Sequence, residues 1–378
     1  MTHEDIAARL ASPRGPVERV ARRWWAASER FLADVRRVWR VLFAPRKSVI
    51  GYTRSHPIYT VLFEENPPRG FVFFRPSGRR VLAPLERLAW RRASLVHLDA
   101  STRAKVGEHT PIVVSCEGRP AEEFLRDRRV KQIYVHSRWA GGDMVDRREA
   151  KLLRLTVPEA PHPVAGGSPN RPLVIATVGY GMVKGHDVAF RVFDTLRNEF
   201  PLHLVIAGAF GHNWQWYPEI SREAYERIDF PSLERRIRSD PHVTMRTFSR
   251  PEVLRKVFPL ADVYLHLARM DTYPLSVLEA MSFGLPIVAT RLNAIAEMVK
   301  HGEGGFLVEH GGLDEIGSPE WAERVHREAT VATRLLLADA ALRSRMGEGN
   351  RARLRHAFSM DFVRSELEHT YSTVIRRS

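Results

Sequence analysis

Cysteine and long apolar runs are scarce in this chain. Cys116 is the single cysteine among 378 residues, which rules out an internal disulfide and leaves no thiolate cluster for a structural zinc site. No apolar run approaches the roughly 18 residues of a membrane-spanning helix. The first residues, MTHEDIAARL, lack the hydrophobic stretch of a signal peptide. These absences favour a protein that folds in the reducing cytoplasm.

Metal-binding patterns are also missing. The sequence has no Asp-x-Asp, no His-x-His and no His-Glu-x-x-His array, and such short patterns hold divalent ions in many enzymes. We therefore predict chemistry that needs no metal and no bound cofactor.

Acidic residues are too few to balance the basic residues in the first half. The chain carries a net charge of +14, and residues 1–165 contain 31 Lys and Arg against 18 Asp and Glu, whereas residues 166–378 contain 27 against 26. A one-sided positive field attracts an anionic partner such as an acidic lipid surface, an anionic glycan or a nucleic acid. No RNA- or DNA-reading motif is present, which disfavours nucleic acid.

Residues 16–46 are rich in arginine and in aromatic residues. Apolar residues recur at helical spacings of three, four or seven from Val17 to Leu42, and Trp39 and Phe43 widen this apolar stripe. Two interpretations stay open. The segment is either a helix that lies in a membrane interface or an ordinary amphipathic helix that packs on its own domain.

The length of the chain favours two domains. Short apolar runs from Ser48 to Val157 predict the strands of a first α/β domain, and VPEAPHPVAGGSPNRP is the predicted linker. Strand and helix patterns then alternate, which predicts a second parallel sheet with helices on both faces. The expected parts are a basic helical segment at 1–47, Rossmann-like domains at 48–165 and 166–357, and a helix at 358–378 that crosses back to the first domain.

Candidate ligand-binding residues lie in residues 263–290, VYLHLARMDTYPLSVLEAMSFGLPIVAT. The pattern of this segment predicts a strand, a loop, a helix, a turn and a second strand. Asp271 follows the strand. Pro274 suits the first helical turn, so the amides of Leu275 and Ser276 would be unpaired donors where phosphate binds. Glu279 would reach another part of an elongated ligand. Spacing alone leaves a simpler interpretation open, namely a helix-start acid and a solvated glutamate.

This stretch resembles the E(x7)E signature of glycosyltransferase family 4, the glycosyl transferases group 1. The family pattern is an acid followed by Thr, an aromatic residue and Pro, then an EAM and a G-x-P-V-V-A block. Here it is D(x7)E, with Asp271 as the first acid and Tyr273 as the aromatic residue. The resemblance implies the GT-B fold, two Rossmann-like doubly wound parallel-sheet domains facing a cleft, and a retaining transferase. It also implies that Asp271 orients donor hydroxyls while Glu279 holds the ribose.

Two further segments resemble donor-binding parts of the family. TVGYGMVKGHD at 177–187 resembles the G-R-x-x-x-x-K-G loop, beginning at Gly179, with Lys184 as the lysine that neutralises the donor diphosphate. The family's arginine is Tyr180 here, which removes one cation. VTMRTFSRPEVLRKVFPLADVYLHL resembles the block in which backbone near Ser249 and Arg250 would meet the nucleotide base.

The first domain resembles the family weakly. PIVVSCEG matches a family strand that ends in His-Gly or His-Asp, which puts Glu117 where a histidine usually lies. YTRSHP follows the first predicted strand, so Arg54 and His56 would project into the cleft. A histidine beside proline is more often structural. These three residues are the predicted acceptor-side groups.

Together the motifs predict a retaining, metal-independent transferase with Lys184, Asp271 and Glu279 as its catalytic residues. It would move a hexosyl group from a nucleoside diphosphate sugar to a hydroxyl of a cell-envelope glycan or lipid-linked acceptor. It would work in the cytoplasm, or peripherally on the inner face of the cell membrane with its basic half on anionic lipid. Two alternatives stay open: a sugar-nucleotide epimerase of GT-B fold, and a non-catalytic protein that binds anionic ligands and keeps a decayed transferase domain.

Overall fold

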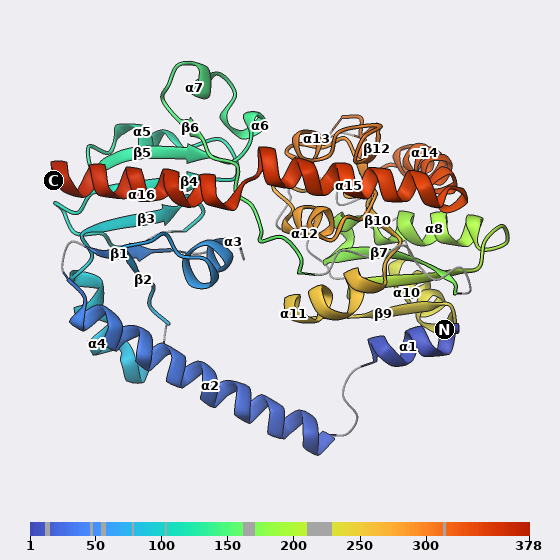
Figure 1. Cartoon of the computed structure of the whole chain (residues 1–378), viewed down its shortest axis with the longest axis horizontal. Coiled ribbons are helices and arrows are strands. Elements are labelled where there is room, and N and C mark those ends of the chain that lie inside the picture. Colours follow the sequence, from blue (N-terminus) through green and yellow to red (C-terminus); the bar gives the residue numbers. More distant parts are fainter. Residues whose placement is uncertain are drawn as a thin grey trace. The chain divides into compact units, whose positions relative to one another are not determined.

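The computed structural model forms two compact units (Figure 1). Unit 1 comprises Met1–Ala11 and Val157–Ala357, and unit 2 comprises Ser12–Thr156 and Phe358–Ser378. The structure describes residues 1–11, 16–45, 48–53, 58–77, 79–102, 104–161, 171–209, 229–312 and 315–378. In this part of the chain, no helix is both long and apolar enough to span a membrane.

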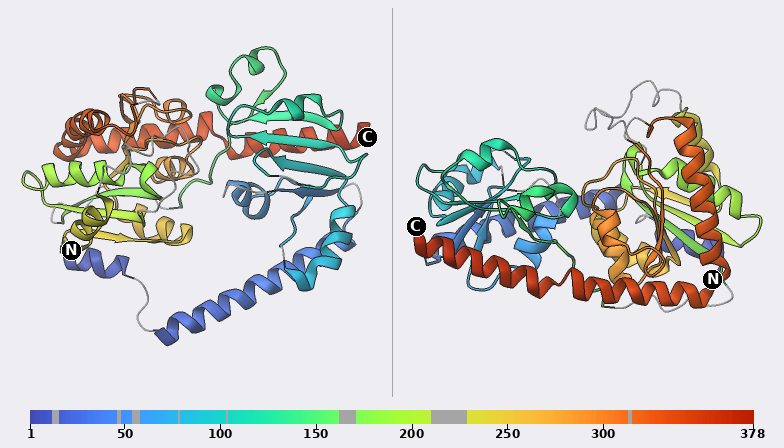
Figure 2. Two further views of the ribbon diagram at one scale, coloured as in Figure 1. Left: turned by 180° about the vertical axis from the view of Figure 1, so that it is seen from behind. Right: turned by 90° about the horizontal axis from the view of Figure 1, so that it is seen from above.

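Unit 1 contains a parallel sheet with the strand order β12-β11-β10-β7-β8-β9. The strands are β7 (Leu173–Tyr180), β8 (Leu202–Ala209), β9 (Val243–Arg246), β10 (Val263–His266), β11 (Ile287–Thr290) and β12 (Gly305–Val308). The main helices around this sheet are α8 (His186–Leu196), α10 (Phe230–Ser239), α12 (Leu275–Phe283), α14 (Pro319–Ala338) and α15 (Ala340–Ala357). Helices cover both faces of the sheet, as the two views of Figure 2 show, which is why its strands are mostly apolar along their whole length.

Unit 2 contains a second parallel sheet, with the order β2-β1-β3-β4-β5-β6. Its strands are β1 (Val49–Tyr52), β2 (Val72–Phe74), β3 (Leu95–Asp99), β4 (Ile112–Cys116), β5 (Val130–Val135) and β6 (Lys151–Leu152). Its longer helices are α2 (Pro16–Phe43), α4 (Ala83–Arg91) and α16 (Met360–Arg377), and short ones are α3 (Ile58–Thr60), α5 (Glu122–Arg126), α6 (Arg138–Gly141) and α7 (Asp143–Asp146). The predicted fold class, two doubly wound parallel sheets, is confirmed.

Each terminal helix packs on the sheet that is remote from it in sequence. The helix α16 lies on unit 2, where the hydroxyl of Tyr371 is 2.5 Å from His97 Nδ1 and the hydroxyl of Tyr134 donates to Glu366. The helix α1 (His3–Leu10) lies on unit 1, where the His3 ring stacks on His242. Long-range burial of these helices fixes both ends of the chain.

The observed units differ from the expected boundaries in two ways. The segment expected over residues 1–47 is divided, because α1 packs on unit 1 while α2 packs against β2 and α4 of unit 2. The first part of unit 2 ends at Thr156, whereas the sequence placed the boundary at residue 165 within the proline-rich stretch. The reason is that the segment after Thr156 makes its contacts with unit 1, as in the ion pair of Arg355 with Glu159.

Unit 2 also holds all the excess positive charge. Its residues include 33 Lys and Arg and 18 Asp and Glu, a formal charge of +15, so unit 1 is close to neutral. This uneven distribution follows the division of the fold more closely than it follows the halves of the sequence.

Candidate functional site

The strand order of unit 1 reverses between β7 and β10, which pair in parallel through Ile175 with Val263 and Ala176 with Tyr264. In doubly wound sheets, ligands bind beyond the carboxyl ends of the strands at such a switch point. The loops that follow β7 and β10 carry Lys184 and Asp271, respectively. The structure therefore brings two residues predicted from separate motifs to one edge of one sheet.

Glycines shape the loop that carries Lys184. Gly179 has φ +153°, and a Cβ added to it would lie 2.6 Å from Cγ of Lys184. Gly185 has φ +70°, and its Cβ would lie 1.8 Å from the backbone oxygen of Leu267. Both positions exclude larger residues, because a side chain would displace the lysine or the neighbouring strand. The loop thus turns tightly enough to direct Lys184 across to the β10 loop.

Lys184 and Asp271 form an ion pair. The Nζ atom of Lys184 donates to Oδ2 of Asp271 at 2.5 Å, and Nε2 of His266 lies 3.1 Å from the same oxygen. Burial alone would raise the pKa of Asp271, but the charge of Lys184 and the hydrogen bonds from His266 and Lys184 outweigh it and hold this pKa below its usual range. Asp271 is therefore an anion, held in place from two sides.

Tyr264 links this ion pair to the start of α12. Its hydroxyl lies 3.2 Å from Nδ1 of His266 and donates to Oγ of Ser276 at 2.9 Å. Burial, and then the charges of Asp271 and Glu279, raise the pKa of Tyr264, so its proton stays on the ring oxygen. A continuous polar chain runs from Lys184 to Ser276.

The helix α12 begins one residue later than expected. Pro274 is its N-cap, with φ −72° and ψ 111°, rather than a residue of the first turn. A proline cap fixes φ without supplying a side-chain acceptor. The amides of Leu275 and Ser276 still occupy the first turn, where helical hydrogen bonding leaves N–H groups for an anion. Tyr273, predicted beside them, is buried.

Glu279 is buried in the middle of α12 and pairs with an arginine from another element. The Nε atom of Arg250, at the start of α11 (Arg250–Glu252), donates to Oε1 of Glu279 at 2.5 Å. The simpler interpretation from spacing, in which Glu279 is a solvated helix residue, is therefore wrong. Arg250 stands beside the helix whose first turn is suited to phosphate.

Two predicted donor residues lie differently from the rest. The N–H and hydroxyl of Ser249 both donate to Oε2 of Glu252 in a capping box, and its carbonyl accepts from the amides of Glu252 and Val253. These groups of Ser249 therefore serve the start of α11. The side chain of Tyr180 lies outside the described residues.

A buried ion pair that sequence reasoning missed supports both loops. Arg269, in the β10 loop, donates to both carboxylate oxygens of Asp187 in α8 at 2.7 Å, and its guanidinium lies 4.7 Å from the ring centroid of Trp321. Its backbone N–H donates to the carbonyl of Val183, next to Lys184. This pair positions Lys184 and Asp271 relative to each other. Asp187 is the last residue of TVGYGMVKGHD, the segment that carries Lys184. Its position in this motif is the sequence signal that could have identified it.

The carboxyl edge of the unit 2 sheet carries its own cluster. Glu117 directly follows β4, as predicted. Burial, and then the charges of Asp99 and Glu117, raise the pKa of Tyr59 well above its ordinary value. The hydroxyl of Tyr59 is 3.3 Å from Nε2 of His136. Asp99, His136 and Tyr59 were not predicted. Asp99 ends the strand run LVHLD and His136 directly follows β5, whereas Tyr59 lies in the short helix α3.

Arg54 and His56, the other two predicted acceptor-side residues, lie outside the described residues. Thr53 precedes them at the end of β1, and its hydroxyl accepts from the amide of Asp99 at 2.8 Å. The order of the unit 2 sheet reverses at β1 and β3, so Thr53 and Asp99 mark its switch point. This edge is the candidate acceptor site.

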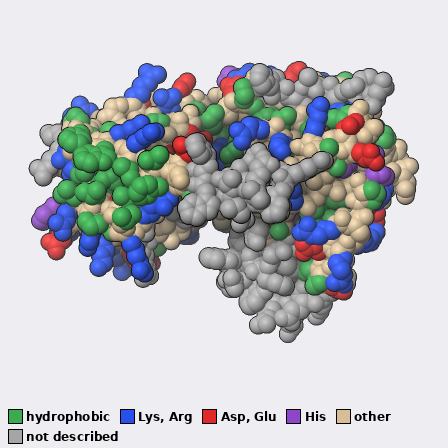
Figure 3. All heavy atoms as spheres, turned by 90° about the horizontal axis from the view of Figure 1, so that it is seen from below, with side chains coloured by type: hydrophobic (Ala, Val, Ile, Leu, Met, Phe, Trp, Pro, Cys, Tyr) green, Lys and Arg blue, Asp and Glu red, His purple; other side chains and the backbone are tan. Residues whose placement is uncertain are grey.

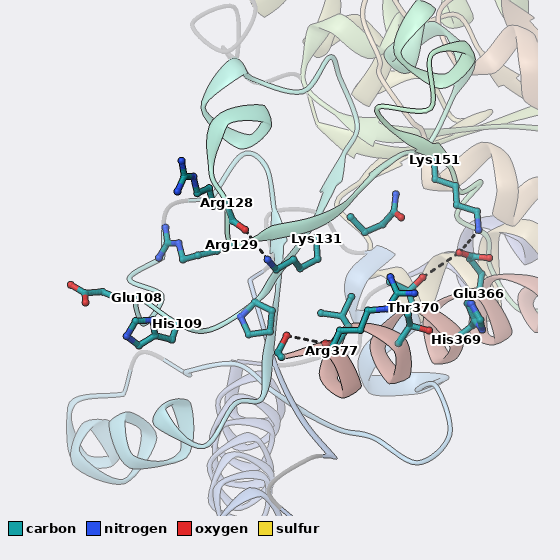
Figure 4. Close-up of a pocket in the computed structure, with 15 residues that line it drawn as sticks. Glu108, His109, Arg128, Arg129, Lys131, Lys151, Glu366, His369, Thr370 and Arg377 are labelled. Atoms are coloured by element: carbon teal, nitrogen blue, oxygen red, sulfur yellow. Dashed lines mark hydrogen bonds and ion pairs between the residues drawn. The ribbon is translucent and has the colours of Figure 1, made fainter.

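A separate basic pocket of about 670 Å³ lies at the opposite, amino edge of the unit 2 sheet. In Figure 4, Arg128, Arg129 and Lys131 come from the start of β5, and His369 and Arg377 come from α16. Its position at the amino ends of the strands separates it from the candidate acceptor site.

The two doubly wound parallel-sheet units define the GT-B class of fold. The structure is similar to that of HepE from Anabaena, solved with UDP and glucose, with a TM-score of 0.56 and 13% identity over 86% of this chain and 99% of that one. It is similar to sucrose-phosphate synthase from Thermosynechococcus elongatus, with a TM-score of 0.57 and 16% identity over 88% of this chain and 90% of that one. At these identities the likeness shows the fold alone.

Sequence comparison links unit 1 to glycosyltransferases. Residues 171–326 match the family described as Glycosyl transferases group 1. N-acetyl-alpha-D-glucosaminyl L-malate synthase from Bacillus anthracis is 31% identical over 121 residues, which are 32% of this chain and 28% of that protein. The capsular polysaccharide biosynthesis glycosyltransferase CapM from Staphylococcus aureus is 30% identical over 101 residues, 27% of this chain and 23% of that protein. The chain thus matches less than a third of either curated relative.

Proposed function

We propose that this chain is a retaining, metal-independent glycosyltransferase that moves a hexosyl group from a nucleoside diphosphate sugar to a hydroxyl group. The observation that carries the proposal is the meeting of Lys184, Asp271 and the start of α12 at the switch point of unit 1. The family match over residues 171–326 covers all three parts. HepE, which shares the fold, was solved with UDP and glucose.

Lys184 and the first-turn amides of α12 would act on the leaving group. Negative charge builds on the diphosphate as the bond to the sugar breaks, and a cation and N–H donors that are already in place stabilise it without a metal ion. Lys184 is paired with Asp271, so the diphosphate would share this cation with the carboxylate. Asp271 would orient sugar hydroxyls, and Glu279 would bind the ribose. No protein nucleophile is part of the proposal.

Arg250 would supply the second cation that Tyr180 cannot. The family resemblance places an arginine at position 180, and the chain has tyrosine there. Arg250 reaches α12 from a different loop and is held there by Glu279. Ribose hydroxyls that bind Glu279 would compete for the same carboxylate and leave the guanidinium available to phosphate oxygens.

The acceptor is proposed to be a cell-envelope glycan or a lipid-linked glycan. CapM, one of the relatives, is described as a capsular polysaccharide biosynthesis enzyme. The formal charge of +15 on unit 2, which carries the candidate acceptor site, suits a phosphorylated or otherwise acidic acceptor and a position on the inner face of the cell membrane.

A thermal-shift panel tests the donor site. The full chain is heated with UDP, GDP, ADP or TDP and with the matching nucleotide sugars, alongside Lys184→Ala and Glu279→Ala. Ligand at about a hundred times its dissociation constant stabilises a fold by roughly 2.7 kcal/mol. We expect a response to one base that both variants lose. No response to any nucleotide would contradict the proposal and favour the anionic-ligand-binding alternative.

Product analysis then separates a transferase from an epimerase. The responding nucleotide sugar is incubated without acceptor and its sugar is examined. Conversion to an epimer without release of nucleoside diphosphate would replace the transferase proposal with the epimerase. Release of nucleoside diphosphate that depends on added glycan acceptor is the expected result.

A further inference from the structure

The helix α2 has two apolar faces. Val38 and Val41 are buried against unit 2 and belong to its core. Leu32, Trp39 and Phe43, which are 45%, 50% and 78% exposed, lie on another face at spacings of seven and four residues, and the rings of Trp39 and Phe43 stack. The packing interpretation of residues 16–46 is therefore correct for one face and leaves the other face unexplained.

The neighbouring helix α4 repeats this arrangement. Ala89 is buried in the same core cluster as Val38 and Val41. Val81, just before α4, and Leu85 and Leu88 within it are 72%, 40% and 52% exposed and share one stripe at spacings of four and three. The helices α2 and α4 contact each other. Their outer stripes form the hydrophobic patch in Figure 3, on the side of the molecule where Figure 1 places these two helices.

Arginine surrounds this patch. Seven charged residues are exposed among the described side chains of α2 and of residues 80–91. Six are arginines and one is an acid: Arg30, Arg36, Arg40, Arg80, Arg87, Arg91 and Glu29. The acids Asp34 and Glu64 beneath them are paired with Arg37. Figure 3 shows the basic side chains around the hydrophobic ones. The docking surface is defined as Leu32, Trp39, Phe43, Val81, Leu85 and Leu88 with Arg36, Arg40, Arg80, Arg87 and Arg91. Arg30 is left out, because helical spacing places it on the side of α2 opposite Leu32 and Trp39.

We propose that this docking surface binds an anionic lipid bilayer. Aromatic and aliphatic side chains beside arginines are suited to the region between lipid headgroups and acyl chains, where amphipathic helices lie in the membrane plane. Each arginine near the surface of an anionic membrane adds about fivefold to binding. Two copies of this chain joined through the surface would bring two arginine rims together, and the repulsion disfavours self-association. The proposal adds a second helix and a membrane orientation to the proposed placement of the enzyme, on which it rests.

Vesicle sedimentation with the full chain tests the docking surface. The probes are vesicles of phosphatidylcholine alone and of phosphatidylcholine with phosphatidylglycerol. Three double variants are compared: Trp39→Ser with Phe43→Ser, Arg36→Glu with Arg40→Glu, and Arg128→Glu with Lys131→Glu. The third pair lies in the pocket of Figure 4 and changes the net charge as much as the second pair does. All six side chains are exposed, so the folded state should persist, as melting curves check.

We expect wild-type chain to bind the anionic vesicles more than tenfold better than the neutral ones. The aromatic pair and the Arg36 and Arg40 pair should each lower binding at least tenfold, and the Arg128 and Lys131 pair should lower it much less. Equal losses in the two charge variants would overturn the proposal, because they would show attraction by net charge alone. Undiminished binding without Trp39 and Phe43 would also overturn it, as would a dimer in sedimentation velocity that these two serines abolish.

Failure of the docking surface is distinguishable from failure of the proposed transferase. The donor response in the thermal-shift panel belongs to unit 1, whereas every docking variant lies in unit 2. A docking variant that loses vesicle binding is expected to keep the donor response of the wild type. Loss of both in the same variant would overturn the assignment of the two properties to separate surfaces.

Discussion

Lys184 is the residue whose placement depends most on its neighbours. Gly179 makes room for its side chain, Asp271 holds its ammonium group, and Arg269 fixes the backbone at Val183 beside it. A lysine at the surface would lose much of its electrostatic effect to solvent, whereas this one is 17% exposed and pairs with Asp271. Its chemistry in the proposed reaction therefore follows from burial as much as from charge.

Replacing Lys184 tests this role. Lys184→Met removes the cation from the place where diphosphate charge would develop, and losses of about a hundredfold to a thousandfold in kcat follow when a transition-state donor is removed. We expect a loss of this size, measured as nucleoside diphosphate release with acceptor present. Lys300→Met is the matched control, since Lys300 is exposed and pairs with the exposed Glu303. A Lys184 variant with wild-type kcat would remove Lys184 from the catalytic residues.

The role of Arg250 in donor binding is tested by removing its charge and then placing a cation at position 180. Arg250→Gln should raise the KM for the nucleotide sugar about tenfold or more, since a charge-assisted hydrogen bond contributes roughly 1.5–3 kcal/mol. Tyr180→Arg in the same variant restores a cation at the position where the family resemblance expects one. Recovery of at least part of the donor affinity is the expected outcome, measured by the KM for donor in both variants. No recovery would mean that Arg250 serves only to hold Glu279.

At the scale of elements, one link between α8 and the β10 loop organises the donor site. Asp187 and Arg269 are 6% and 1% exposed and form two hydrogen bonds. Burial opposes ionisation of Asp187, but the charge of Arg269 and its hydrogen bonds hold the pKa of this aspartate below its usual range. Both groups are charged in the fold, and each depends on the other.

Breaking this pair should be costly. Arg269→Met leaves Asp187 as a buried charge without its partner, and such changes cost about 3–5 kcal/mol. The double variant Arg269→Met with Asp187→Leu should cost less than the single one, because no charge is left alone. Denaturant unfolding gives the free energy of unfolding of the wild type, the single variant and the double variant. Arg291→Met is the control, since Arg291 pairs with Glu309 at the surface and should cost at most about 1 kcal/mol. Equal losses for Arg269 and Arg291 would contradict the argument.

The sequence predicts contacts well where they are local and poorly where they join distant elements. The strand and helix alternation and the motif spacing were enough to place Lys184, Asp271 and α12 on one sheet edge. They could not show that Arg269 pairs with Asp187, or that Arg250 pairs with Glu279, because each contact joins segments that lie far apart in the chain. The outer apolar stripe of α4 was also missed, since exposure depends on which face the tertiary fold buries.

At the scale of the whole molecule, buried histidines make stability depend on pH. The pKa of His97 is lowered to about 3, and those of His186 and His203 to about 4, in each case mainly by burial. His97 belongs to unit 2 and the other two to unit 1. The charge of a nearby histidine adds to the lowering for all three: His136 for His97, His266 for His186, and His3 for His203. Both units therefore contain histidines that the fold keeps neutral.

The sign of the effect follows from proton binding. An unfolded histidine titrates near pH 6.5, so between about pH 6.5 and pH 4 the unfolded chain binds protons that the folded chain does not. Stability is complete above this window and is lost as the pH falls through it, by about 1.4 kcal/mol per pH unit for each histidine. We expect urea unfolding at about pH 5 to show a lower free energy than at about pH 7 in both units. His186→Gln should reduce this difference for unit 1, and His356→Gln, at an exposed histidine of the same unit, should leave it unchanged. A free energy of unfolding that is flat from pH 7 to pH 5 would mean that these histidines reach water in the folded protein.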